Sequence, residues 1–225
     1  NKLTKIVHFS SIHAHIPLGQ EHTINEKAPY ITEEDVAYDY SKSMGEQLML
    51  QARSSGINVC IVNPTAVIGP FDFSPSLSGK MIIDVYTGKL KSLVKGGFDW
   101  VDVRDIAKAT VAIVEKDIVN EKFILSGQWM GFKDLGNLIC SVKGSRYKGF
   151  ISPIYLAKIG LPFIALWSKV SGTDPLYNYE SLKAIEEGSK INDHANARQL
   201  INYYPRPLEE TIHDSIKWFE QNNFI

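Results

Sequence analysis

Residues 57–70 read INVCIVNPTAVIGP, an apolar run rich in β-branched residues that is followed by two prolines and a glycine. The run predicts a buried strand over 57–62, and the residues after it predict a fixed loop at the carboxyl end of that strand. A strand that is apolar on both faces is typical of a parallel sheet with helices packed on it. This stretch therefore favours an α/β fold.

Strand and helix patterns alternate on both sides of this stretch. Upstream, residues 5–10 (KIVHFS) predict a second strand, and residues 32–51 predict a helix with a capping box at Thr32 and Asp35 and a stop at Gly56. Downstream, the pattern continues with strands at 99–103 and 122–125 and with helices at 77–86, 105–116 and 132–142. This order predicts part of a doubly wound parallel sheet.

The strand patterns stop at about Tyr147. Four helices are predicted beyond it, at 151–169, 179–187, 194–201 and 208–222. We therefore expect an α/β region at 1–145 and a smaller, mostly helical region at 146–225 that covers a site on the sheet. The longest unbroken apolar stretch, 159–167, is far shorter than the roughly 20 residues that span a bilayer, so we expect no membrane segment.

The composition argues against several classes of protein. The chain has 225 residues, with 24 Lys and Arg against 25 Asp and Glu, so no basic field is available to hold a nucleic-acid backbone. Cys60 and Cys140 form no C-x-x-C pair, which argues against a disulfide framework and favours a cytoplasmic protein. His13, His15 and His22 lack a carboxylate at a supporting spacing, so we expect no metal site.

The best candidate for chemistry is YDYSK at 38–42, a Tyr-x-x-x-Lys pattern. On a helix, residues i and i+4 share a face, so the ammonium of Lys42 can lie near the phenol of Tyr38. A neighbouring cation favours the phenolate form, as a tyrosine general acid/base requires. The same spacing recurs at Tyr179 and Lys183, in the helical region and without accompanying motifs, and we interpret that copy as an ordinary helix face.

Polar residues accompany the ends of the first two predicted strands. Ser10 and Ser11 follow the first strand, and the loop 63–70 follows the second. Open α/β sheets bind ligands at the carboxyl ends of their strands, so a serine there can hydrogen-bond a substrate oxygen. The motifs G-x-S-x-G, H-E-x-x-H and G-x-x-x-x-G-K-[ST] are absent, which argues against a serine hydrolase, a zinc protease and a P-loop protein. We interpret His8, inside the first strand, as a hydrogen-bonded core residue.

Four sequence motifs are more informative together, in the order in which they occur, than any one of them alone. They are FSS at 9–11, YDYSK at 38–42, NPTAVIGP at 63–70 and WVDVRDIA at 100–107. The combination resembles the extended short-chain dehydrogenases/reductases of the NAD-dependent epimerase/dehydratase group, which includes proteins like dihydroflavonol reductases and 3β-hydroxysteroid dehydrogenases. The resemblance covers nearly the whole chain, because YPRPLEE at 204–210 resembles the start of their last helix. In the fourth motif we expect structural roles, with Asp105 capping a helix and Asp102 bonding backbone.

The resemblance implies a role for each matching position. Tyr38 would be the catalytic acid/base, and Lys42 would favour its phenolate and hydrogen-bond the nicotinamide ribose. Ser11, or else Ser10, would be the catalytic hydroxyl that holds the substrate oxygen, and His13 would face the substrate. The residues implied at the nicotinamide end of the cofactor are Tyr38, Lys42, Pro64, Thr65, Ala66 and Val67.

The implied protein is an enzyme with a Rossmann-type sheet. It would transfer a hydride between the nicotinamide of NAD or NADP and a carbinol or carbonyl carbon of a small molecule. A sugar nucleotide, a sterol-like compound and another ketone or alcohol are alternative substrates, and the reaction can be that of a dehydrogenase, a reductase, an epimerase or a dehydratase. The resemblance also leaves room for a homodimer.

The chain departs from the family pattern in two places. Ile12 stands where many relatives carry a third serine or threonine. No glycine-rich dinucleotide-binding turn occurs, and by analogy we expect roughly 100 residues of cofactor-binding βαβ units to be missing before Asn1. The alternative to the enzyme is a truncated, non-catalytic fragment that acts as a scaffold or an interaction module.

Overall fold

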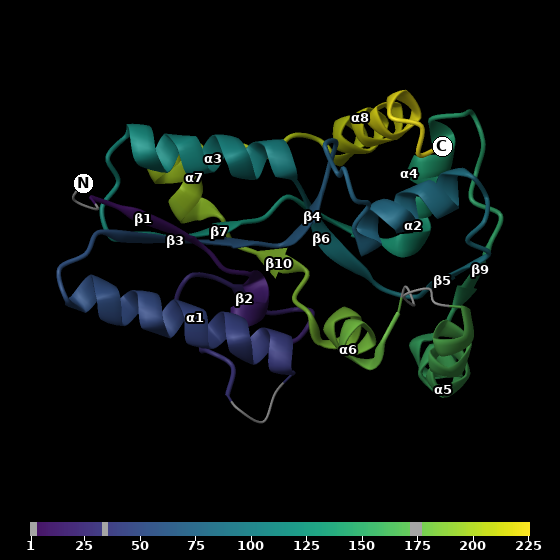
Figure 1. Cartoon of the computed structure of the whole chain (residues 1–225), viewed down its shortest axis with the longest axis horizontal. Helices are drawn as coiled ribbons and strands as arrows, with labels where there is room; N and C mark the ends of the chain where they lie inside the picture. The colour runs from purple at the N-terminus through teal and green to yellow at the C-terminus, as the bar shows by residue number, and fades with distance from the viewer. Residues whose placement is uncertain (1–3, 33–35, 172–176) are drawn as a thin grey trace.

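Short strands and helices alternate along most of the chain in a computed structural model that describes residues 4–32, 36–171 and 177–225 (Figure 1). The strands are β1 (Ile6–Phe9), β2 (Thr23–Ile24), β3 (Val59–Pro64), β4 (Ala66–Ile68), β5 (Ser92–Val94), β6 (Gly97–Asp102), β7 (Lys122–Leu125), β8 (Gln128–Gly131), β9 (Phe150–Ser152) and β10 (Ile191–Asn192). The helices are η1 (Ile12–Ala14, a 3-10 turn), α1 (Ala37–Ser54), α2 (Leu77–Tyr86), α3 (Val103–Glu115), α4 (Phe132–Ser141), α5 (Ile154–Ser171), α6 (Tyr179–Glu187), α7 (Ala195–Ile201) and α8 (Leu208–Gln221).

Strand β3 lies between β1 and β7 in a three-stranded parallel sheet. Val7 of β1 is opposite Cys60 of β3, and Val62 of β3 is opposite Phe123 of β7. Every residue of β3 is buried. The reason is that α1 covers one face of this sheet while α3 and α7 cover the other (Figure 1). The predicted α/β class and the strands predicted here are confirmed.

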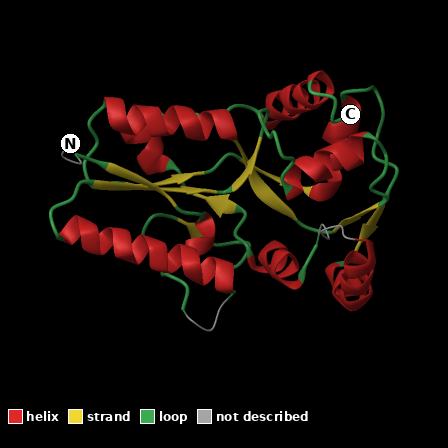
Figure 2. Cartoon of the chain, viewed as in Figure 1, coloured by secondary structure: helices red, strands yellow, loops and turns green. Residues whose placement is uncertain are grey.

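The apolar side chains between this sheet and helices α3 and α7 form one core, which we call the sheet cluster. Its members are Cys60, Val62, Val101, Ile106, Ala109, Ile113, Phe123, Leu125, Ala197, Ile201 and Tyr203. The burial of these side chains removes apolar surface from water and is the main force that holds α3 and α7 to the sheet. Helices therefore flank the strands on both sides, as Figure 2 shows.

Helix α1 meets the sheet through polar side chains. Its buried residues are Ser43 and Glu46, whereas a helix that covers a sheet usually buries an apolar stripe. The helix begins at Ala37, later than predicted, and Asp35 of the predicted capping box lies outside the described residues. It ends where predicted, because Gly56 adopts a left-handed φ of +90°.

A second sheet begins where β3 ends. In it β4 runs parallel to β6, and β8 runs antiparallel to β6 with Trp100 opposite Gln128. The predicted loop over 63–70 is wrong for Ala66–Ile68, because pairing with β6 makes these residues strand β4. A loop is also predicted where β8 lies, and β8 makes this sheet mixed rather than parallel.

The predicted absence of strands after Tyr147 is wrong as well. Strand β9 pairs in parallel with β5, and β10 pairs in parallel with β2. These strands are only two or three residues long and pair with distant parts of the chain, so no alternating pattern marks them in the sequence. As a result α5 begins at Ile154, directly after β9.

The largest core joins α2, α4 and α8 to the second sheet. Helix α8 supplies Leu208, Ile212, Ile216 and Phe219, whose spacing places them on one face of the helix. The buried members of this large cluster are Ile68, Met81, Ile82, Ile83, Val85, Leu93, Val94, Trp100, Phe132, Leu135, Ile139, Cys140, Leu182, Ile185, Leu208, Ile212, Ile216, Trp218 and Phe219. They come from both sides of Tyr147, so the C-terminal helices share a core with the second sheet.

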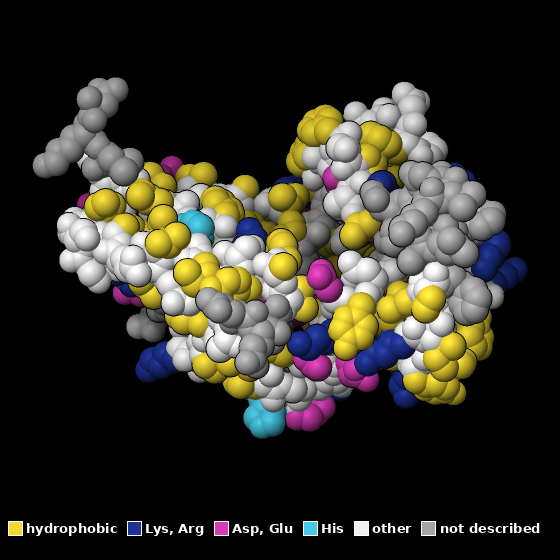
Figure 3. Space-filling model, turned by 60° about the horizontal axis from the view of Figure 1, so that its bottom comes forward, with side chains coloured by type: hydrophobic (Ala, Val, Ile, Leu, Met, Phe, Trp, Pro, Cys, Tyr) yellow, Lys and Arg dark blue, Asp and Glu magenta, His cyan; other side chains and the backbone are white. Residues whose placement is uncertain are grey.

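Helix α5 exposes apolar side chains to solvent. Tyr155, Leu156 and Ile159 on this helix are exposed, and so is Phe150 just before it. Figure 3 shows hydrophobic side chains gathered on this part of the surface. None of the helices in the described ranges combines the length and the apolarity needed to cross a membrane.

The structure confirms the backbone hydrogen bond predicted for Asp102 and corrects the helix cap predicted for Asp105. Asp102 caps α3, because its Oδ1 accepts a hydrogen bond from the backbone N–H of Arg104 at 2.7 Å. Asp105 bonds backbone instead, accepting from the N–H of Arg206 at 2.8 Å and from the guanidinium of the same residue at 2.8 Å. The cause is that α3 begins at Val103, two residues before its predicted start. Asp105 thereby ties α3 to the segment that leads into α8.

Gly127 lies in the turn after β7, where the chain passes close to the backbone of β6. A Cβ at this position would overlap the carbonyl oxygen of Trp100 and come within 2.9 Å of the Cα of Val101. Backbone atoms of a paired strand cannot move aside as the end of a flexible side chain can. Gly160, in α5, provides a contrast, because a Cβ added there would meet no neighbouring atom within 4 Å.

We expect Gly127→Ala to lower the free energy of unfolding by about 2 kcal/mol, the usual range for overpacking. The control Gly160→Ala should raise it by about 0.5–1 kcal/mol, because alanine favours a helix over glycine. Urea unfolding followed by circular dichroism measures both. Equal effects of the two variants would contradict the close approach at Gly127.

Candidate active site

A cavity of about 490 Å³ opens at the carboxyl ends of β1 and β3, between α1 and α6. It contains all the predicted site residues except Lys42. The polar and strand-end residues that line it include Ser10, Ser11, His13, Tyr38, Asp39, Pro64, Thr65, Ala66, Val67, Asn178, Glu180 and Ser181. Three of the four predicted motifs, those at 9–11, 38–42 and 63–70, thus meet helix α6 around one space.

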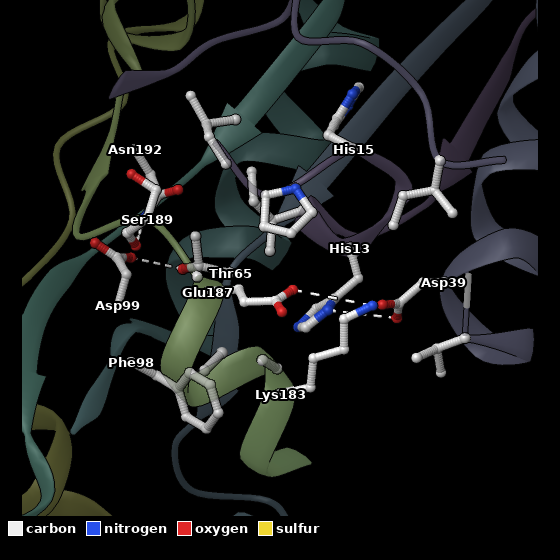
Figure 4. A pocket seen from close by; sticks show the side chains of 18 of the residues that line it. His13, His15, Asp39, Thr65, Phe98, Asp99, Lys183, Glu187, Ser189 and Asn192 are labelled. Carbon is white, nitrogen blue, oxygen red and sulfur yellow. Dashed lines mark hydrogen bonds and ion pairs between the residues drawn. The ribbon is translucent and has the colours of Figure 1, made fainter. Parts of the chain in front are cut away.

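A smaller cavity of about 160 Å³ adjoins the first and shares His13, Asp39 and Thr65 with it. It extends between α6 and β10, where Lys183 and Glu187 line it. Figure 4 shows His13 and Asp39 facing each other, with Lys183 beside them and Glu187 across from it. The two cavities thus share part of their lining, and together their linings run from the strand ends to the helical region.

Tyr38 and Lys42 lie on the first turns of α1, one helical turn apart. The Lys42 ammonium lies over the ring of Tyr38, 5.6 Å from its centroid. The Tyr38 side chain is 52% exposed, and the ring of His13 approaches it edge-on at a centroid distance of 6.3 Å. Lys42 does not itself line the cavity. Its ammonium contacts the ring of Tyr38, which does.

Ser11 caps the 3-10 turn that follows β1. Its hydroxyl oxygen accepts a hydrogen bond from the backbone N–H of His13 at 3.2 Å, which leaves the hydroxyl proton available for donation. Nδ1 of His13 lies 3.4 Å from Oδ1 of Asp39, so Asp39 orients the imidazole ring. Ser10 is also buried at the edge of the cavity. Two hydroxyls and one imidazole thus stand next to Tyr38.

The segment from Pro64 to Val67 forms the floor of the cavity and passes from the first sheet to the second. Pro64 pairs with Leu125 in the first sheet, and Val67 pairs with Val101 in the second. The hydroxyl of Thr65 donates to Oδ1 of the buried Asp99 at 2.6 Å. Thr65 therefore fixes the crossing between the sheets.

Two interpretations from the sequence are corrected here. Lys183 lines the smaller cavity, so the second Tyr-x-x-x-Lys copy is not an ordinary helix face, although its Tyr179 is 63% exposed. His8 is not a satisfied core residue, because its buried Nε2 has no hydrogen-bond partner among the described residues. Burial lowers the pKa of His8, which favours the neutral ring.

A set of buried polar residues that no sequence motif predicted lies near the cavity. Glu46 on α1, Asn63 on β3 and Lys122 on β7 contact one another there, together with Tyr30. The available signal was Glu46, which follows Tyr38 and Lys42 at the same spacing of four residues. None of the His, Cys, Asp and Glu groups in the described ranges has the arrangement of a metal site.

Asp99 is a buried carboxylate that lines the smaller cavity. Its Oδ1 accepts hydrogen bonds from the Thr65 hydroxyl at 2.6 Å and from the Gly127 N–H at 2.7 Å. Burial raises the pKa of Asp99, and these hydrogen bonds oppose the rise without cancelling it. The folded state therefore binds a proton at Asp99 more tightly than the unfolded state does.

We expect Asp99→Asn to raise the free energy of unfolding at pH 7, because an amide oxygen can accept both hydrogen bonds without a buried charge. Ionisation of a group whose folded-state pKa is raised costs stability as the pH rises through that pKa. The advantage of the variant should therefore shrink as the pH falls toward ~4. Urea unfolding at a series of pH values measures it, and a difference independent of pH would contradict the assignment.

Comparisons with known proteins agree with this geometry. The family model described as NAD dependent epimerase/dehydratase matches residues 1–125. Sterol demethylase protein B of Methylococcus capsulatus is 27% identical over 98% of this chain and 68% of that protein. A candidate dihydroflavonol 4-reductase of Synechocystis is 24% identical over 84% of this chain and 56% of that protein.

The same fold occurs in a solved structure of an epimerase. UDP-glucuronic acid 4-epimerase from Bacillus cereus, in complex with UDP-glucuronic acid and NAD, matches with a TM-score of 0.72 and 18% identity, over 99% of this chain and 63% of that one. The chain thus spans between about half and two thirds of the length of these relatives. Because the family model covers more than half of it, the chain belongs to the NAD-dependent epimerase/dehydratase family.

Proposed function

We propose that the complete protein is an oxidoreductase or epimerase that uses NAD or NADP to transfer a hydride to or from a carbinol or carbonyl carbon, with Tyr38 as its acid/base. One observation carries this proposal. Tyr38, Ser11 and the segment Pro64–Val67 line one cavity at the ends of parallel strands, and the Lys42 ammonium lies over the ring of Tyr38. Ligands of open α/β sheets bind at such strand ends.

The residues at this edge fit the nicotinamide end of a dinucleotide. The segment from Pro64 to Val67 crosses between the two sheets and lines the cavity, and the half-exposed Tyr38 lines the same cavity. Tyr38, Lys42 and the floor residues would hold the nicotinamide and its ribose. The bound cofactor supplies the site that accepts or donates the hydride.

The residues of this chain would move the proton that accompanies the hydride. Tyr38 gives its hydroxyl proton to the substrate oxygen when a carbonyl is reduced, and it takes that proton back when an alcohol is oxidised. Ser11 donates its hydroxyl proton in a hydrogen bond to the same oxygen and so polarises the carbonyl. Lys42 favours the phenolate that remains on Tyr38 after the proton has left.

The charge of the lining favours an uncharged substrate. In the described lining of the two cavities, the carboxylates of Asp39, Glu180, Glu187 and Asp99 face a single ammonium, that of Lys183. Lys183 is itself 3.9 Å from Glu187, and Asp39 is engaged with a histidine. Like charges in a cavity repel, so a diphosphate would bind poorly here. The names of the two curated relatives, which refer to a sterol and a dihydroflavonol, support the same class.

We expect Tyr38→Phe to lower kcat of the complete protein by at least ~100-fold, the usual contribution of a general acid/base. The fold should be unchanged, because the phenol is half exposed and phenylalanine keeps the ring. Turnover of NADH or NADPH and the melting temperature measure the two effects. The matched control Tyr179→Phe, in the other Tyr-x-x-x-Lys copy, should leave kcat as it was, and a Tyr38→Phe protein that retains most of its turnover would sink the assignment.

The charge of the cavity can be tested with Glu180→Lys. We expect the wild-type protein to turn over uncharged ring ketones and to bind UDP-glucose weakly. The variant should bind UDP-glucose about tenfold more tightly, since about 1.4 kcal/mol corresponds to a factor of ten, with little change toward the ketones. The control Glu115→Lys, the same charge change on exposed residue 115 at the end of α3, should alter neither. Tight binding of UDP-glucose to the wild type, measured by calorimetry, would contradict an uncharged substrate.

A further inference from the structure

A buried carboxylate lies beneath the candidate active site and takes part in none of the steps above. Glu46, on the sheet-facing side of α1, has 0% exposure. Its Oε2 lies 2.7 Å from the Lys122 ammonium and accepts a hydrogen bond from the Tyr30 hydroxyl at 3.1 Å. Its Oε1 accepts a hydrogen bond from Nδ2 of Asn63. Residues from α1, β3, β7 and the loop before α1 therefore meet at one carboxylate.

The Lys122 ammonium is itself held on a second side. Its Nζ lies 2.8 Å from Nε2 of His15, and Nδ1 of His15 lies 2.9 Å from the carbonyl oxygen of Ala28. This geometry fits a neutral His15 that donates from Nδ1 to the carbonyl and accepts from Lys122 at Nε2. Burial and the Lys122 charge lower the pKa of His15, in agreement with the neutral ring.

Asn63 connects this carboxylate to Ser11, which follows β1 and caps the 3-10 turn. Its Nδ2 has two hydrogens, and it donates to Glu46 and also to the backbone carbonyl of Ser11 at 2.8 Å. Asn63 is fully buried at the end of β3, so its amide has little freedom to turn. A single amide group thus joins α1 to the end of β1.

The position of Glu46 on α1 makes this connection relevant to chemistry. Tyr38, Lys42 and Glu46 follow one another at intervals of four residues, so they form one row along the helix. Contacts that hold α1 at Glu46 fix the rotation of the helix about its own axis. They thereby fix the direction in which Tyr38 points. The side-chain amide of Asn63 also sets the position of Ser11, on the other side of the cavity.

Stability alone does not account for such a cluster. Burial would raise the pKa of Glu46, but the Lys122 ammonium and the hydrogen bonds outweigh burial and lower it, so the carboxylate is charged. Buried ion pairs can often be replaced by apolar residues without loss of stability, because desolvation offsets their attraction. Apolar residues at these positions would form no hydrogen bonds, and so they would not fix the direction of the neighbouring groups as the polar residues do.

We propose that Glu46 and Asn63 are positioning residues that hold Tyr38 and Lys42 on α1 in register with Ser11, which follows β1. The proposal rests on the proposed function for the roles of Tyr38 and Ser11. It assigns to Glu46 and Asn63 no contact with substrate or cofactor. Their effect on turnover would pass through the geometry of the residues that they hold.

The test compares Asn63→Ser and Glu46→Leu with the conservative Glu46→Gln. Serine is too short to bridge Glu46 and Ser11, and leucine cannot accept the hydrogen bond, whereas glutamine keeps an acceptor for the Asn63 amide. We expect Asn63→Ser and Glu46→Leu to lower kcat at least tenfold with KM within about threefold, and Glu46→Gln to retain most of kcat. Asn63→Ser keeps the ion pair between Glu46 and Lys122. This variant therefore still tests the proposal if the Glu46→Leu protein does not fold.

The matched control is Asp105→Asn, which weakens a buried contact with Arg206 outside the cavity lining. It should lower the melting temperature and leave kcat unchanged at a temperature where the protein is folded. If Asn63→Ser also lowers only the melting temperature, Glu46 and Asn63 are structural and the proposal is overturned.

Amide hydrogen exchange supplies a readout that needs no activity. We expect Asn63→Ser to speed exchange in residues 37–45 of α1 relative to α8, and Asp105→Asn to leave that part of α1 unchanged. Unchanged exchange in α1 would overturn the positioning role. A wild-type protein that turns over no nicotinamide cofactor would contradict the proposed function instead, and the exchange measurement would still decide whether Glu46 and Asn63 hold α1.

Discussion

Every residue of β3 is buried, so each polar group on this strand needs a partner inside the protein. Its neighbours β1 and β7 satisfy the backbone, and the two N–H groups of the Asn63 amide find their partners in Glu46 and the carbonyl of Ser11, whereas the amide oxygen has no partner among the described residues. A charged residue of α1 thereby enters the interior, and Lys122 of β7 balances its charge. The polar contact between α1 and the sheet follows from this constraint.

The two sheets meet where β3 ends, and the candidate active site lies along that junction. One oxygen of Asp99, on β6, receives the hydroxyl of Thr65 after β3 and the N–H of Gly127 after β7. The ends of two strands of the first sheet are thus tied to a strand of the second. The floor of the cavity is a rigid crossing, while its opposite wall comes from α6, in the C-terminal part of the chain.

Local patterns predicted the elements whose sequence signals lie within the element itself. The helix over Leu77–Tyr86, the strand Lys122–Leu125 and the helix Tyr179–Glu187 have the predicted bounds, because apolar spacing, caps and turn residues lie within each segment. Strands β2, β5, β9 and β10 were missed because each depends on a partner far along the chain. The site residues that the sequence predicted, except Lys42, line one cavity. The burial of Glu46, however, depends on Lys122, and no spacing rule connects these two positions.

The division of the interior into two cores determines what optical probes can detect. Trp100 and Trp218 both belong to the large cluster, whereas the buried members of the sheet cluster include no tryptophan. Indole emission from these two residues therefore follows the loss of packing around α2, α4 and α8. The thiol of Cys60 is fully buried in the sheet cluster, so its reaction with a thiol reagent reports the opening of the other core. Because the other thiol, Cys140, lies in the large cluster, the reaction of Cys60 has to be followed separately from that of Cys140 to distinguish the unfolding of the two cores.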